Sequence, residues 1–330
     1  MCNIYMFSGD YFIDKTIHTF YTKFITHLCG KQLWRMPRNR IGEKYMNHQK
    51  IAIIVDSGSD VPAALREKYD MKMVSLNVIY PNEQYIDCVD IMPEEIYRRF
   101  PAEVPKTSLP SPDSVQKVLD QIIIEGYEKV LAVCISSNIS GTYNTVKLVC
   151  GQCTQLESFV LDTKNISIGS GLLAIYAAKM LENGMSWEDL IRILPEKRKD
   201  SKVFFYMDTL EYLHKGGRIG LVTSVVGTAL NLKPIISCNE QGVYYTVSMM
   251  RGGRKSISTL LRLATGFAEG HHNAWYGLMN GNAPDKAKEA KGELLHLISL
   301  DQLAAEGQIA PSMAVHTGPG LLGMGVLRVD

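Results

Sequence analysis

The sequence lacks the features of a membrane-spanning, secreted or nucleic-acid-binding protein. No apolar stretch is long enough to span a bilayer, and the nearest, residues 219–232, is interrupted by Thr, Ser and Asn. Seven cysteines in 330 residues are too few for a disulfide scaffold. Since 35 basic residues face 34 acidic ones, the net charge of +1 cannot gather nucleic acid. These absences favour a cytoplasmic globular protein with no nucleic-acid partner and no transmembrane segment, and leave room only for transient contact with a membrane surface.

Motifs for nucleotide binding, serine hydrolysis and metal binding are also missing. There is no P-loop and no G-x-S-x-G. GPGLLG at 318–323 satisfies G-x-G-x-x-G, but only seven residues follow it, too few for a dinucleotide-binding domain. Cys150 and Cys153 form C-x-x-C at the end of an expected helix, whereas a redox pair opens one, and no further zinc ligands have matching spacing. We therefore expect no metal and no cofactor.

Residues 1–49 differ in character from the rest of the chain. Asp10, Asp14 and Lys15 interrupt any apolar segment that could serve as a signal peptide, and no small-residue cleavage site follows. We interpret 1–49 as an atypical N-terminal extension that packs poorly, with Met46 as the more plausible natural start. A transit or anchor role is the alternative.

From Lys50 onward the pattern is that of an α/β protein. The run IAIIVD, from Ile51, is followed by small polar residues, as in a strand buried on both faces. The same pattern recurs at 130–135 and 159–161, and helices are expected at 112–126 and 166–181. Strand followed by helix predicts an N-terminal doubly wound parallel sheet, which we assign to residues 50–185.

Residues 186–330 predict a second α/β domain with a mixed sheet. A connecting helix is expected at 186–199, followed by a strand at 203–206 and a hairpin at 233–250 that turns near Gln241 and Gly242. Further helices are expected at 256–269 and 283–297. Ser312 to His316 is predicted to be the last strand.

Hydroxyl-rich loops follow successive strands of the N-terminal domain, in DSGSD, TSLPSPD and SSNISGT. Ligands bind at the carboxyl ends of parallel strands, and hydroxyls together with main-chain amides at helix starts suit a small anion such as a carboxylate or phosphate. Helix capping is the alternative for each residue taken singly. Three such loops at one edge favour a ligand site.

Two basic elements lie in the C-terminal half. Arg218, in KGGRIG before an expected amphipathic helix, can pair with an anion through two hydrogen bonds, or can belong to an ordinary turn. Arg251, Arg254 and Lys255 are interpreted as an exposed basic patch that could serve as a partner surface.

Taken in order, DSGSD, TSLPS, SSNISGT, LEYLHKGGRIG and HTGPG resemble the signature of the DegV family, bacterial fatty-acid-binding proteins that include the binding subunit of fatty acid kinase. The resemblance runs from about Lys50 to the C-terminus. It implies two α/β domains enclosing a long-chain fatty acid, with the carboxylate at the domain interface and the acyl chain in a buried tunnel. It further implies that the loaded protein presents the carboxylate to a separate kinase, which makes an acyl phosphate.

The resemblance also implies which residues bind. Five would surround the carboxylate: Thr107, Ser108, Ser140, Arg218 and His316. Six form a secondary polar group: Ser57, Ser59, Ser137, Gly141, Thr142 and Thr317. The chain departs from the family pattern at three positions, with Gly58 in place of threonine, Leu109 in place of glutamine, and His214 before KGGRI.

Physical chemistry is consistent with such a ligand. Transfer of a carboxylate from water into a protein interior costs several kcal/mol unless hydrogen-bond donors replace its hydration. Burial of a sixteen-carbon tail contributes about 12 kcal/mol of favourable hydrophobic free energy before ordering costs. The following residues are candidates for the tunnel, with simple core packing as the alternative for each: Ile139, Leu172, Ile175, Val222, Val225 and Leu230.

The leading hypothesis is a non-catalytic carrier. One alternative is a stand-alone hydrolase or phosphoryl-transfer enzyme that uses His316 as a base, although no complete triad or nucleotide cradle is visible. Another is a lipid-responsive regulatory protein that contacts partners through the patch from Arg251 to Lys255.

Overall fold

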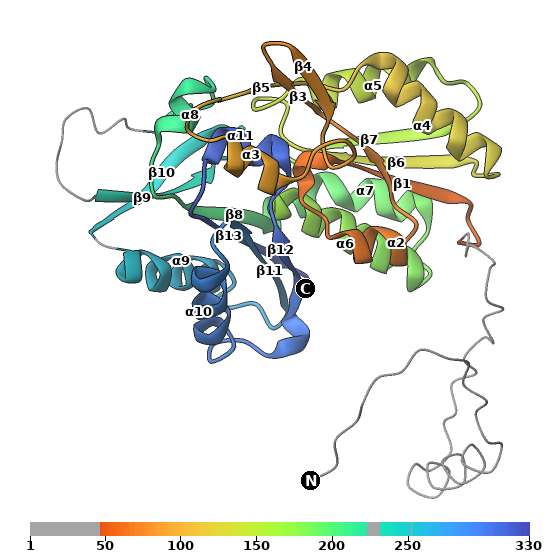
Figure 1. Ribbon diagram of the computed structural model, residues 1–330. Coiled ribbons are helices and arrows are strands. Elements are labelled where there is room, and N and C mark those ends of the chain that lie inside the picture. The colour runs from red at the N-terminus through yellow and green to blue at the C-terminus, as the bar shows by residue number, and fades with distance from the viewer. Residues whose placement is uncertain (1–46, 223–231, 252) are drawn as a thin grey trace, which may run out of the picture. The chain divides into compact units, whose positions relative to one another are not determined.

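Two large sheets organise the protein, each with its own helices (Figure 1). The computed structural model describes residues 47–222, 232–251 and 253–330. The expected extension at 1–49 therefore lies almost entirely outside the described residues. Among these residues no helix is both long enough and apolar enough to cross a bilayer.

The first sheet is parallel, as predicted. Its strands, in spatial order, are β2 (Lys72–Val74), β1 (Ile51–Asp56), β6 (Lys129–Cys134) and β7 (Glu157–Asp162). All six residues of β1 are buried, because alternate side chains of a strand face opposite sides and helices cover both. Ile53 joins the cluster on one side of the sheet and Ile54 the cluster on the other.

Helices cover both faces of this sheet (Figure 1). On one face lie α4 (Pro112–Ile124) and α5 (Thr142–Gln152). The other face carries α6 (Ile168–Glu182) and α7 (Trp187–Lys197), which contacts both α6 and β7. Two short helices, α2 (Ala63–Lys68) and α3 (Pro93–Arg99), complete this half. The doubly wound prediction is confirmed.

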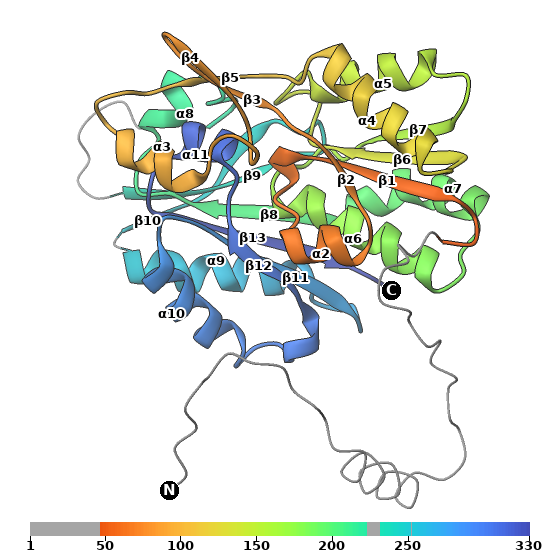
Figure 2. The same cartoon turned by 45° about the vertical axis from the view of Figure 1, so that its right-hand side comes forward.

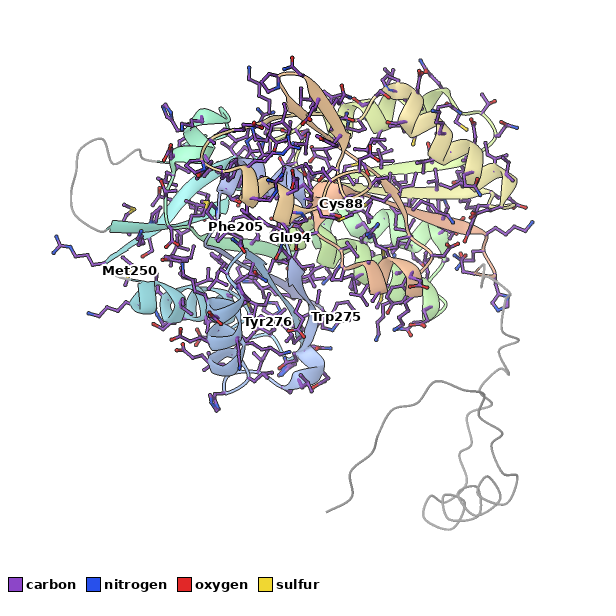
Figure 3. The ribbon with its side chains drawn as sticks, in the orientation of Figure 1. Cys88, Glu94, Phe205, Met250, Trp275 and Tyr276 are labelled. Atoms are coloured by element: carbon purple, nitrogen blue, oxygen red, sulfur yellow. The ribbon has the colours of Figure 1, made fainter. Side chains whose placement is uncertain are left out.

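The second sheet is mixed, again as predicted. Its strands, in spatial order, are β10 (Tyr244–Arg251), β9 (Leu232–Cys238), β8 (Ser201–Tyr206), β13 (Leu321–Arg328), β11 (Ala274–Gly281) and β12 (Leu303–Gln308). Figure 2 shows α9 (Gly253–Phe267) and α10 (Pro284–Leu294) beneath it. Trp275 and Tyr276, marked in Figure 3, are consecutive residues of β11, and their side chains face opposite sides of the sheet. Trp275 packs against Tyr176 of α6, whereas Tyr276 belongs to the apolar cluster between the sheet and α9.

Helix α6 packs between the two sheets, and most of its residues are buried. Glycines of the second sheet allow this close approach: a Cβ at Gly277 would lie 2.3 Å from Ile168 Cγ1, and one at Gly325 would lie 2.7 Å from Ile168 Cγ2. The proposed domain boundary between residues 185 and 186 falls between the end of α6 and the start of α7.

A third, antiparallel sheet was not predicted from the sequence. It comprises β4 (Glu83–Ile86), β3 (Asn77–Tyr80) and β5 (Lys106–Ser108) in that order. The remaining elements are short: α8 (Glu211–Lys215), α11 (Pro311–Thr317), η1 (Ser57–Ser59), η2 (Arg198–Asp200) and η3 (Leu300–Gln302). The small sheet matters because β5 carries Thr107 and Ser108.

The prediction that Ser312 to His316 is a strand is wrong. These residues form α11, which begins with Pro311 at its first position, where proline is favoured because its fixed φ suits the helix and the missing N–H has no partner to lose. The last strand is instead β13, LLGMGVLR. Glycine is uncommon in strands, but here Gly325 makes room for α6, whereas Gly323 lies against Phe205.

Candidate functional site

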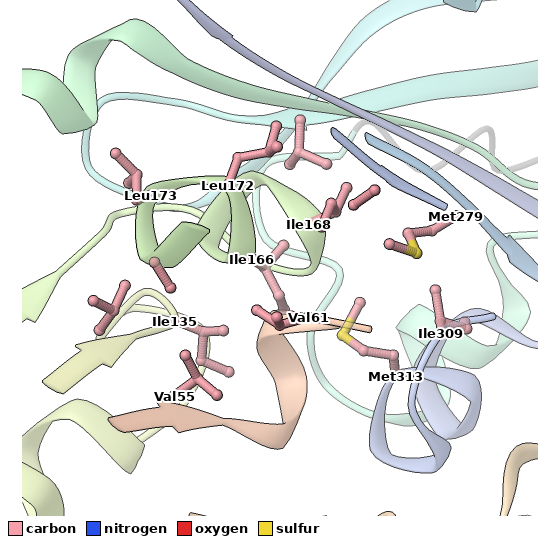
Figure 4. Close-up of a cluster of buried hydrophobic side chains, with 14 of the residues drawn as sticks. Val55, Val61, Ile135, Ile166, Ile168, Leu172, Leu173, Met279, Ile309 and Met313 are labelled. Carbon is pink, nitrogen blue, oxygen red and sulfur yellow. The ribbon is translucent and has the colours of Figure 1, made fainter. Parts of the chain in front are cut away.

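A cavity of about 250 Å³, the central cavity, lies where the three sheets come together. Residues from both halves of the chain line it: Gly58, Leu76, Thr107, Ser108, Leu109, Ile135, Ile139, Ser140, Gly141, Ile166, Arg218, Tyr244, Ser312, Met313 and His316. One part of this lining is polar and the rest is apolar. Figure 4 shows that Ile135, Ile166 and Met313 belong to a larger apolar cluster.

The structure brings all five predicted carboxylate-binding residues to this cavity. They come from four separate segments: Thr107 and Ser108 from β5, Ser140 from the loop before α5, Arg218 from the turn after α8, and His316 from α11. Their role toward a ligand stays a prediction, but their convergence is a property of the fold.

Thr107 and His316 are hydrogen-bonded to each other, with 2.7 Å between Thr107 Oγ1 and His316 Nε2. Burial, with a smaller contribution from the charge of Arg218, lowers the pKa of His316 to about 4. The ring is therefore neutral near pH 7 and carries one proton. If that proton is on Nε2, His316 donates to Thr107, and the hydroxyl hydrogen of Thr107 is free to donate to a ligand.

Ser140 and Ser108 add two further hydroxyls. Ser140 Oγ lies 2.8 Å from Thr142 Oγ1, and Ser140 stands two residues before Thr142, the first residue of α5, whose dipole favours an anion at this end. Ser108 Oγ accepts a hydrogen bond of 3.3 Å from Asn77 Nδ2. Their main-chain bonds are long, since Ser108 Oγ donates to Leu109 O at 3.4 Å and Ser140 Oγ accepts from Thr142 N at 3.3 Å, so each hydroxyl can turn toward a ligand.

Arg218 stands between the central cavity and a second cavity of about 480 Å³, the basic cavity. Thr107, Arg218 and His316 line both, and Lys106 and Lys215 line the basic cavity alone. Arg218 Nη1 donates to Gly216 O at 2.8 Å, which fixes the guanidinium next to His316. An anion at the polar end of the central cavity would thus also border the basic cavity.

Most of the predicted secondary polar residues do not reach the central cavity. Ser57 Oγ accepts from Leu76 N, Ser59 Oγ donates to Asp56 O, Ser137 Oγ accepts from Lys164 Nζ, and Thr317 Oγ1 donates to Met313 O. Gly141 lines the cavity, and Thr142 touches it through Ser140. For Ser111, which accepts from Ser114 N, the capping alternative is the right one.

Of the six tunnel candidates, Ile139 lines the central cavity. Leu172, Ile175 and Val222 are buried in the core away from it, and Val225 and Leu230 lie outside the described residues, as does most of the expected amphipathic helix. Sequence reasoning missed Tyr244 and Ser312. No local sequence signal identifies Tyr244 as a cavity residue, since a single tyrosine in a strand is ordinarily interpreted as part of the hydrophobic core.

Three buried aspartates, the acid cluster, lie behind the cavity wall: Asp56, Asp60 and Asp87. Asp56 Oδ2 accepts from Ile135 N at 2.7 Å, Asp60 Oδ1 from Ala310 N at 2.7 Å, and Asp87 Oδ1 from Ser312 N at 2.9 Å. The cluster therefore holds the start of α11, which carries His316, and the end of β6.

Burial is the largest cause of the altered acidity of this cluster. It raises the pKa of Asp56 and of Asp60 to about 7, with mutual repulsion adding to the effect and hydrogen bonds opposing it. The pKa of Asp87 is raised for the same reason.

Among residues 47–222, 232–251 and 253–330, no three His, Cys, Asp or Glu side chains are placed so that they could hold a metal ion.

Two other sequence features have plain outcomes. Cys150 and Cys153 lie at the carboxyl end of α5 as unpaired thiols, as expected, and burial raises the pKa of Cys150 to about 11, which disfavours the reactive thiolate. In the basic patch, Arg251 and Lys255 are exposed, whereas the side chain of Arg254 lies outside the described residues.

Fold and site together define a two-domain α/β protein with a cavity lined by both polar and apolar side chains. A family model described as "Uncharacterised protein, DegV family" matches residues 50–329. A DegV domain-containing protein of Clostridium acetobutylicum is 41% identical over 281 residues, which cover 85% of this chain and 99% of the relative. The chain belongs to the DegV family.

Solved structures agree with this assignment. A structure described as fatty acid binding of a DegV family protein from Thermus thermophilus has a TM-score of 0.78 and 31% identity, over 84% of this chain and 99% of that one. A stearic-acid-binding protein from Eubacterium ventriosum has a TM-score of 0.76 and 29% identity, over 84% and 98%. Both support the two-domain fold.

Proposed function

We propose that this protein binds a long-chain fatty acid in the central cavity and has no catalytic activity of its own. The acyl chain lies against the apolar side chains of the lining. The carboxylate contacts the five polar side chains predicted for it, which are Thr107, Ser108, Ser140, Arg218 and His316. The observation that carries the proposal is the meeting of these five side chains, from four segments, at one cavity. The names of the Thermus and Eubacterium structures support the ligand class.

The chemistry of the polar end suits a carboxylate. Hydrogen bonds to a charged group contribute about 1.5–3 kcal/mol each. A neutral His316 that donates to Thr107 leaves the hydroxyl hydrogen of Thr107 for the carboxylate, without adding a second full charge next to Arg218. One cation and several hydroxyls replace the hydration that a buried carboxylate loses.

We further propose that the bound acid is presented to a separate fatty acid kinase. The basic cavity supports this step, because Lys106, Lys215 and Arg218 line it next to the place assigned to the carboxylate. A phosphoryl group arriving there would meet positive charge. Hydroxylamine trapping should detect acyl phosphate only when the loaded protein, ATP and a fatty acid kinase are combined; acyl phosphate formed without the kinase would contradict the proposal.

The geometry gives little support to a stand-alone enzyme. Thr107 and His316 form a hydroxyl–imidazole pair, but among the described residues His316 Nδ1 has no hydrogen-bond partner to orient the ring, as a catalytic triad needs. If the protein is nevertheless an enzyme, it turns over acyl esters or ATP alone, and His316→Gln abolishes that turnover.

The direct test is to identify what the protein carries. Protein purified from a bacterial host and extracted under denaturing conditions should release close to one fatty acid per chain by mass spectrometry. Native protein that is free of lipid and has no affinity for oleate would overturn the proposal.

A matched pair of serine variants tests the site. Ser140→Ala should weaken palmitate binding at least about tenfold while leaving the unfolding midpoint nearly unchanged, because one donor to a charged group is lost. Ser111→Ala, which removes the cap of α4 away from the cavity, should cost about 1 kcal/mol of stability and leave affinity intact. Equal affinities of the two variants would argue against carboxylate binding at Ser140.

A further inference from the structure

Gly58 lines the central cavity without a side chain and faces Ile135, which lines the same cavity. A Cβ at position 58 would lie 3.1 Å from Ile135 Cδ1, 3.3 Å from Asp56 Oδ1 and 3.7 Å from Ile135 Cγ2, so Ile135 makes the tightest contact. Ordinary van der Waals contacts begin at 3.4 Å, so Ile135 would have to move by a few tenths of an ångström to admit any side chain at 58.

The space into which Ile135 can move is the cavity itself. Ile135 is only 2% exposed and belongs to the same apolar cluster as Val55 and Ile166 (Figure 4). Protein interiors are packed as densely as organic crystals, so these neighbours leave no free volume. A methyl group at 58 therefore reduces the central cavity, either directly or by displacing Ile135.

Backbone conformation does not require glycine at this position. Gly58 is not among the glycines with positive φ, so an L-residue can adopt its backbone angles. Its main-chain oxygen accepts from Ser167 N at 2.9 Å, a bond that any residue would keep. What glycine supplies here is room.

We propose that Gly58 is a specificity-determining residue that sets the upper limit on the acyl-chain length the central cavity accepts. This inference rests on the proposed function. At about 250 Å³ the cavity is below the roughly 300–1,000 Å³ typical of small-molecule sites, so one added carbon is a substantial fraction of the usable space.

Binding of saturated acids from lauric to stearic tests the inference by isothermal titration. Gly58→Ala should weaken stearate at least about fourfold relative to laurate, since one displaced methylene corresponds to that factor. Ile135→Val removes Cδ1, the atom nearest to the added Cβ, and should shift the preference toward longer chains. The double variant Gly58→Ala/Ile135→Val should return close to the wild-type profile.

Gly151→Ala is the matched control, because a Cβ at Gly151 meets nothing within 4 Å and Gly151 does not line the cavity. It should leave the whole chain-length profile unchanged. Should Gly58→Ala fail to fold, Ile135→Val alone still decides the matter through its shift toward longer chains.

The outcomes separate the inference from the function beneath it. A wild-type protein that binds none of the acids overturns both. A wild-type protein that binds them, with Gly58→Ala and Ile135→Val giving its unchanged profile, overturns only the role of Gly58.

Discussion

The hydroxyls of the central cavity and the carboxylates of the acid cluster arise from similar loops, yet they are bonded differently. Asp56, Asp60 and Asp87 each accept a main-chain N–H at 2.7–2.9 Å from a neighbouring segment. The shortest bonds of Ser108 and Ser140 are instead to other side chains, at 3.3 Å and 2.8 Å, and their main-chain bonds, to Leu109 O and from Thr142 N, are longer at 3.4 Å and 3.3 Å. The first set holds the wall of the cavity in place, and the second keeps bonding capacity for a ligand.

This difference teaches that polarity alone does not mark a binding residue. A buried polar group that accepts a main-chain N–H from another segment stabilises the fold, and removing it leaves that N–H unsatisfied. A group with unused donors at a cavity can bind. The two sets should therefore respond to mutation in opposite ways, the acid cluster through stability and the hydroxyls through affinity.

Asp60→Ala is expected to have the largest effect. Asp60 accepts from Ala310 N and from Ser167 Oγ, and both donors would be left buried without it. The free energy of unfolding should fall by about 3 kcal/mol, measured by urea denaturation near pH 6, where the carboxyl is largely neutral. Asp120→Ala, on the exposed side of α4, serves as the control and should change stability by less than about 0.5 kcal/mol. A similar small effect at Asp60 would erase the distinction between the two sets.

Thr107→Val and Thr317→Val sharpen the comparison with isosteric changes. Thr107 lines the cavity, and its loss should weaken fatty acid binding about 10- to 100-fold, because both a donor and the partner of His316 disappear. Thr317 donates to Met313 O within the same helix region and should cost about 1 kcal/mol of stability without changing affinity. Titration calorimetry and thermal unfolding of the two variants decide this, and a reversed pattern would refute the assignment.

The N-terminal half was largely predictable because its signals are local. Buried strands of a parallel sheet read as continuous apolar runs, and β1 and β6 do so. Since such strands end at one edge of the sheet, the meeting of the loop after β6 with other polar loops follows from topology. The hydroxyl-rich loop that contains Thr107 and the cation in KGGRIG also indicated anion binding, whereas for His316 only the resemblance pointed to the carboxylate.

The unpredicted parts depend on contacts distant in sequence. The strand β13 contains two glycines, which disfavour a strand, and one of them, Gly325, is explained only by the packing of α6 against it. The strands β3 to β5 are too short to show a period. Ser312 and His316 share α11, whose start is held by Asp87 from another part of the chain. Tyr244 enters the cavity from the second sheet, a placement that only the packing of the two sheets decides.

A pH series gives the smallest but most specific expected effect. A carboxyl whose pKa is raised on folding from 3.8 to about 7 binds more protons in the folded state between those values, so Asp56 and Asp60 should make folding more favourable as the pH falls. The gain from about pH 8 to about pH 6.5 should be roughly 1–2 kcal/mol in total, by urea denaturation.

Below about pH 6.5 His316 opposes this trend, because its lowered pKa means that the unfolded chain takes up the proton first. The interval above that pH therefore reports the acid cluster with little interference from the site. Asp56→Asn keeps an acceptor for Ile135 N and should remove about half of the gain. If the stability does not rise as the pH is lowered from about 8 to about 6.5, the acid cluster is ionised in the folded protein. Its carboxylates would then be stabilised by a counter-charge or by solvent, and the contrast with the cavity hydroxyls would be lost.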